Sequence, residues 1–99
     1  MSDYAFYAAM LRFVEGKIRH SGAAQADPRT GMMMDLLAGA AESVAAGRTM
    51  HFAADRLDLA ARAFAGFAAF LQKQILPEAV AHGNAEGEQE RVQQCVNTA

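Results

Sequence analysis

The chain has 99 residues, of which 53% are apolar and 20% are charged, and its formal net charge at pH 7 is −2. This length suits one domain with one core, and the composition excludes a disordered chain. The nine Lys and Arg residues form no patch, which argues against nucleic acid as a partner, because that binding depends on clustered cations. Alanine dominates the apolar residues and strand-favouring residues are scarce, which predicts an all-α bundle of three to five helices as a single domain over residues 1–99.

The first predicted helix runs to about His20. Ser2 or Asp3 can cap its start, and Gly22 can end it in the left-handed conformation that glycine adopts without strain. Phe13 widens its apolar surface beyond what one neighbouring helix can cover. The principal apolar stripe repeats at steps of three and four residues and consists of Tyr7, Leu11, Val14 and Ile18.

The second predicted helix follows a small-residue linker over residues 23–26. Asp27 is an acceptor suited to a helix cap, and Pro28 has the fixed φ that suits the first helical position. Gly47 ends the helix. Three consecutive methionines, residues 32–34, cannot all face one core, so Met32 or Met34 must be exposed or meet a second surface. These methionines and Met50 could line an adaptable groove for a peptide or an apolar ligand, although core packing is the simpler interpretation, above all for Met33. The predicted inner face is Met33, Leu36, Leu37, Ala40 and Val44.

The third predicted helix is the strongest signal in the chain. Its regular part covers residues 55–75, we favour Thr49 over Asp55 as its cap, and Pro77 is expected to end or kink it because proline lacks an amide donor. Small residues among the aromatic ones, including Ala65 and Gly66, predict a close approach to another helix. With the first helix, this element supplies the predicted core and interface residues, which are Tyr7, Phe13, Phe64, Phe67, Phe70 and Leu71.

The last part of the chain carries a thinner apolar stripe. Asn84 can cap a final helix whose inward side has little beyond Val92, Cys95 and Val96. We expect residues 84–99 to be the least ordered part, or to pack on a second copy of the chain.

Histidine and carboxylate pairs suggest a weak metal hypothesis. His51 with Asp55, and Glu78 with His82, each stand four residues apart, so each pair could face one way on a helix. If two helices brought the pairs together, they would form a bundle-centred site, although neither pair has the Glu-x-x-His spacing of di-iron bundles.

No residue pattern predicts catalysis. Cys95 has no histidine near it in the sequence, no serine stands in a nucleophile motif, and no glycine pattern for phosphate is present. We therefore expect no enzyme activity and no cofactor. One cysteine cannot form an internal disulfide, the first residues lack the basic region of a signal peptide, and the longest apolar run is too short for a membrane span, so the expected location is the cytoplasm.

The sequence thus favours a helical protein-interaction or regulatory module that acts as a homodimer or larger homo-oligomer. The expected partners are a second copy of the chain or another protein, and neither nucleic acid nor membrane. The excess apolar surface of the first and third helices is the basis for dimerisation, since a monomer would expose an unusually large apolar patch. A metal-binding bundle and an apolar-ligand carrier remain the alternatives.

Overall fold

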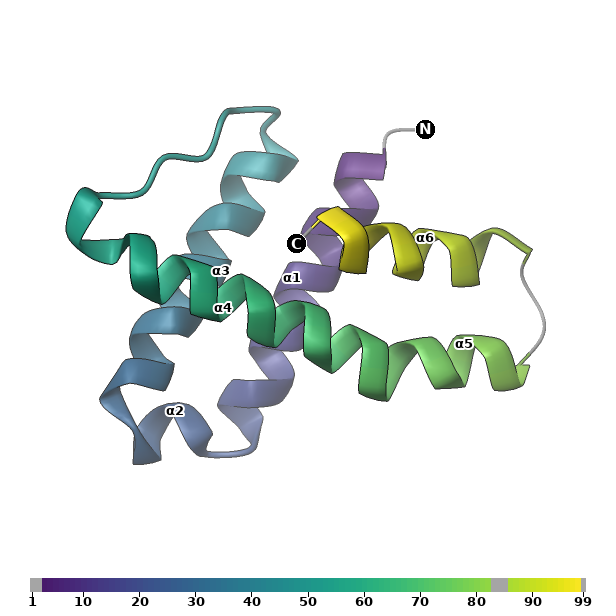
Figure 1. Cartoon of the computed structure of the whole chain (residues 1–99), viewed down its shortest axis with the longest axis horizontal. Helices are drawn as coiled ribbons and strands as arrows, with labels where there is room; N and C mark the ends of the chain where they lie inside the picture. The colour runs from purple at the N-terminus through teal and green to yellow at the C-terminus, as the bar shows by residue number, and fades with distance from the viewer. Residues whose placement is uncertain (1–2, 83–85, 99) are drawn as a thin grey trace.

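The computed structural model describes residues 3–82 and 86–98, and this part of the chain is all-α, as predicted (Figure 1). Within it there is no strand. The elements are α1 Asp3–His20, α2 Ala23–Ala26, α3 Pro28–Ala45, the 3₁₀ turn η1 Ala54–Arg56, α4 Leu57–Phe70, the π-helical segment η2 Leu71–Ile75, α5 Leu76–His82 and α6 Glu86–Thr98.

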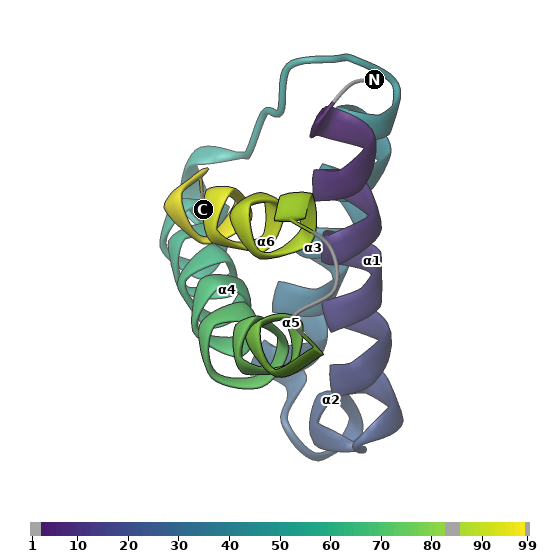
Figure 2. The same cartoon turned by 90° about the vertical axis from the view of Figure 1, so that its right-hand side faces the viewer.

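The helices form two layers. Helices α1 and α3 run side by side in opposite directions, with α2 at the turn between them (Figure 1). The second layer crosses the first and contains α4, η2 and α5 in one line, with α6 folded back beside them (Figure 2). The core lies between these two helical hairpins.

The first hairpin is formed by the turn residues that the sequence indicates. Gly22 ends α1 with φ 85°, and the Asp27 carboxylate accepts a 3.0 Å hydrogen bond from the Arg29 amide at the start of α3. The predicted linker over residues 23–26 is instead one helical turn. Gly31 lets α3 pass close to that turn, because a Cβ at this position would lie 3.3 Å from the Ala24 carbonyl oxygen.

The buried face of α3 is turned by about one residue from the predicted one. Met34 is buried, whereas Met33 and Leu36 are only half-buried. Ala41 is buried as well, because α1 and α4 contact α3 on adjacent sides. The fully buried or nearly buried residues of this helix are Met34, Leu37, Ala40 and Ala41.

The central helix starts later than predicted. Residues 48–53 form an irregular link, so Thr49 is not its cap, and neither is Asp55, which lies within η1. The link lets Phe52 fold back onto α4, where its ring meets Phe64 edge to face at 6.0 Å between centroids. Burial of this aromatic pair therefore takes precedence over the local capping preference of Thr49.

Pro77 widens the helix and does not end it. The Leu76 amide donates to the Leu71 carbonyl five residues earlier, which gives the π-helical turn η2 directly before the proline. Pro77 has no amide to donate, and the wider turn relieves the crowding of its ring against the preceding turn. The chain therefore stays helical from Leu57 to His82.

Helix α6 completes the core of its own chain. Val92 and Cys95 are buried, and α6 contacts α1, α4, η2 and α5. Val92 and Cys95 are therefore covered by their own chain, and a second copy is not needed to bury them. The predicted cap Asn84 lies outside the described residues, as does Ser2. The largest fully buried side chains are Phe67, Leu11, Leu37, Leu71, Val14 and Val92.

Candidate functional site

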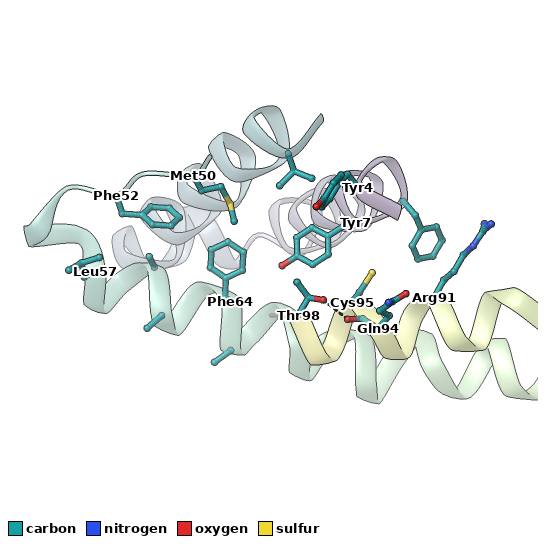
Figure 3. Close-up of a pocket in the computed structure, with 15 residues that line it drawn as sticks. Tyr4, Tyr7, Met50, Phe52, Leu57, Phe64, Arg91, Gln94, Cys95 and Thr98 are labelled. Atoms are coloured by element: carbon teal, nitrogen blue, oxygen red, sulfur yellow. Dashed lines mark hydrogen bonds between the residues drawn. The ribbon is translucent and has the colours of Figure 1, made fainter. Parts of the chain in front are cut away.

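The described structure contains an apolar cleft of about 980 Å³. It lies between the first half of α1, the end of α3, the irregular link, the first half of α4 and the second half of α6 (Figure 3). Its lining residues are Tyr4, Phe6, Tyr7, Val44, Met50, Phe52, Leu57, Ala60, Ala61, Phe64, Ala65, Arg91, Gln94, Cys95 and Thr98.

Aromatic side chains give the cleft its shape. Phe52 and Leu57 lie at one end, Phe64 lies in the middle, and Tyr7 stands between Phe64 and the α6 residues (Figure 3). The Tyr7 ring also meets Phe67 of the core edge to face, with 5.7 Å between centroids. Tyr7 thus anchors one wall of the cleft to the core, which keeps that wall in a defined position.

Tyr7 is buried, and this changes its acidity. Burial, with a smaller electrostatic contribution from Cys95, raises the pKa of Tyr7 from 10.0 to about 12. The cause is the cost of placing a phenolate among apolar groups. At neutral pH the side chain is therefore a neutral phenol and adds no charge to the cleft.

We expect the raised pKa of Tyr7 to make the protein less stable in alkaline solution. The unfolded chain loses the phenolic proton near pH 10 and the folded chain near pH 12, so the free energy of unfolding falls between these values, by at most about 3 kcal/mol. Below pH 10 this residue has no effect on the pH dependence. Urea titrations of wild type and Tyr7→Phe at several pH values measure this pH-dependent change in the free energy of unfolding. The free energy of unfolding of wild type should fall relative to that of Tyr7→Phe above pH 10, and parallel profiles up to pH 12 would contradict the assignment.

Arg91 is the one lining residue with a formal charge. Its guanidinium carbon lies 5.8 Å from the centroid of the Phe6 ring, and Figure 3 shows the side chain at the end of the cleft opposite Phe52. In the part of the chain that the structure describes, the ion pairs all belong to Arg19 and Arg62. Among the described side chains, Arg91 thus lies near an aromatic ring and forms no ion pair.

Within its own chain, α4 makes no close helix contact through Ala61, Ala65 or Gly66, and a contact of these small residues with a second copy stays a prediction. Ala61, Ala65 and Gly66 are exposed, and a Cβ added at Gly66 would meet no atom within 4 Å. The alanines that α4 buries are Ala60 and Ala63. Ala61 and Ala65 are instead among the residues that line the cleft.

The predicted core and interface residues are found in three environments. Phe67 and Leu71 are fully buried, and Phe70 is half-buried against the core. Tyr7 and Phe64 belong to both the core and the wall of the cleft. Phe13 is 41% exposed and lies outside the core, with the Lys17 ammonium 5.5 Å from its ring centroid.

The structure does not bring the predicted metal ligands together. His51 lies in the irregular link and Asp55 in a 3₁₀ turn, so this pair does not share a helix face. Glu78 lies near the far end of the long helix, roughly 30 Å away at 1.5 Å per residue (Figure 1). The His82 side chain is outside the described part. Among the described residues, no group of three or more His, Cys, Asp or Glu side chains could hold a metal ion.

Several cleft residues were not predicted as site residues. Met50 was considered for a groove, but Phe52, Leu57 and Arg91 were not singled out. An available signal was the apolar pair Met50 and Phe52 within an expected turn, because apolar residues in a connecting segment usually have a packing role. Arg91 gave no signal, since one cation on an acidic helix is common.

Comparisons with known proteins give no relatives. No family model matches the chain, and neither the curated proteins nor the solved structures include one that is significantly similar to it. In the described residues, the helices are too short or too polar to cross a membrane.

Proposed function

We propose that this protein binds an apolar small molecule in the cleft and acts as a carrier or sensor without catalysing a reaction. The observation that supports this most directly is a cleft of about 980 Å³ with a mainly aromatic and aliphatic lining. Volumes of roughly 300–1,000 Å³ with such linings are typical of small-molecule sites. An apolar-ligand carrier, which the sequence left open as an alternative to the interaction module, is thus our leading proposal.

The chemistry of the lining supports binding more than catalysis. It includes phenol, amide, hydroxyl and thiol groups, but no carboxylate and no imidazole. General acid and base catalysis near neutral pH most often uses those two groups. Cys95 is buried, and the lining holds no histidine that could activate its thiol.

Filling the cleft should abolish binding. Ala65 is exposed on α4 and lines the cleft, so Ala65→Trp would place an indole in the cleft without disturbing the core. We expect wild type to enhance the fluorescence of Nile red, a neutral apolar dye, and Ala65→Trp to lose at least about 10-fold in affinity, the equivalent of 1.4 kcal/mol. Native mass spectrometry of freshly purified protein shows whether a molecule is retained.

Ala81→Trp is the matched control, because Ala81 is also an exposed helical alanine but lies on α5 outside the cleft. This variant should bind the dye as wild type does. Equal binding by all three proteins would mean that the dye binds outside the cleft. If wild type does not bind the dye, the result argues directly against a carrier.

Self-association is the second candidate function, and exposed apolar side chains support it. Tyr4 and Leu57, which are 70% and 56% exposed, lie at the cleft, while Val80 on α5 is 53% exposed. A second copy could cover such residues, as the predicted homodimer requires. Light scattering behind a sizing column over a range of concentrations tests this. A monomer at every concentration would reject the homodimer and leave the carrier proposal intact.

The cellular setting is part of this proposal. A negative net charge, a single buried cysteine and the absence of a spanning helix among the described residues agree with a cytoplasmic protein that binds neither nucleic acid nor membrane. Fractionation of cells that express a tagged chain would test it.

A further inference from the structure

We propose that the ligand is a single-chain amphiphile with an anionic head, such as a fatty-acid-like monocarboxylate, whose head is bound by Arg91 and whose chain lies along the cleft over Phe64. This inference rests on the proposed function, because it names the ligand class of the same cleft. It follows from the charge, the geometry and the long axis of the site.

The charge distribution selects an anionic head. Among the fifteen lining residues only Arg91 is charged, and its charge is positive. Glu88 and Glu90 are exposed on the same helix and do not line the cleft. Their charges disfavour a head with several negative charges, so a single carboxylate fits this end better than a phosphate.

The geometry leaves Arg91 able to bind such a head. Its guanidinium carbon lies 5.8 Å from the centroid of the Phe6 ring, within cation–π distance. The N–H donors point outward in the plane of the guanidinium, where they match the two oxygens of a carboxylate. No described carboxylate lies within ion-pair distance of them.

The long axis of the cleft suits an extended chain. Arg91 stands at one end, and Phe52 and Leu57 stand at the other, with Phe64 between them (Figure 3). A head at Arg91 would therefore place the tail against the aromatic and aliphatic end. The short side chains of Ala61 and Ala65 leave room along this path.

The test compares two probes of equal chain length, decanoate and decan-1-ol, as competitors of Nile red at neutral pH. Wild type should bind decanoate more tightly than the alcohol. Arg91→Gln should weaken decanoate binding about 10-fold and change alcohol binding less than about two-fold, as expected for one lost charge-assisted hydrogen bond. Arg29→Gln is the control, because Arg29 is an exposed cation at the start of α3, outside the cleft, and its loss changes the net charge equally.

Each outcome decides the inference. A carboxylate preference that Arg91→Gln removes and Arg29→Gln keeps supports it. If both probes bind wild type equally, or if Arg91→Gln leaves the preference intact, the role of Arg91 is refuted while the apolar-ligand proposal stands. If neither probe binds and Nile red also fails, both proposals fall. Circular dichroism checks the fold of Arg91→Gln, and Arg91→Lys, which keeps the charge, should retain part of the preference.

Discussion

Phe67→Ala should lower the free energy of unfolding by about 3–5 kcal/mol. The Phe67 side chain is 0% exposed and lies where α4 meets α1, with its ring edge to face against Tyr7. Removing the ring leaves a cavity that the surrounding helices fill only in part. In a domain of this size the melting temperature should fall by at least about 12 °C, which thermal unfolding followed by circular dichroism would measure.

Phe13→Ala is the matched control, because it removes the same ring from a position that is 41% exposed on α1. Its cost should stay below about 1 kcal/mol, with the contact to Lys17 as the main loss. Equal costs for the two substitutions would mean that Phe67 is not the centre of the core.

Val92→Asp should detach α6 or unfold the protein. Val92 is buried in the interface of α6 with the rest of its chain, and a carboxylate there would have no described partner. An unpaired buried charge costs about 3 kcal/mol or more, which is a large part of the stability of a small domain. Urea unfolding gives the loss, and limited proteolysis shows whether α6 is cleaved first.

Asn97→Asp makes the same change of charge on an exposed position of the same helix and should have little effect. If Val92→Asp were as stable as this control, α6 would not pack on its own chain in solution. Val92 would then be expected to pack against an apolar surface of a partner chain.

The helical class and the first hairpin could be predicted because local chemistry determines them. Asp27 and Pro28 form the start of α3, and Gly22 and Gly47 take the positive φ values that end helices. Phe67 was recognisable as a core residue because its neighbours at helical spacing are apolar as well. In these segments local preference and tertiary packing agree, so the sequence pattern was sufficient.

The cleft could not be predicted because contacts between distant segments create it. Thr49 is a good cap by its chemistry, yet burial of Phe52 against Phe64 keeps residues 48–53 out of the helix. Small residues such as Ala61 and Ala65 are compatible with close helix packing and equally compatible with an open cleft. Only the positions of the link and of α6 distinguish these two outcomes.

One helix therefore serves two requirements that often compete, and Phe64 and Ala60 take part in both. The buried side of α4, with Ala63 and Phe67, carries folding, while its exposed side, with Ala61 and Ala65, borders the cleft. Substitutions on the exposed side change stability by only about 0.5 kcal/mol in either direction. The preference for one ligand over another can thus drift during evolution, or be redesigned in the laboratory, while the fold keeps its margin of stability.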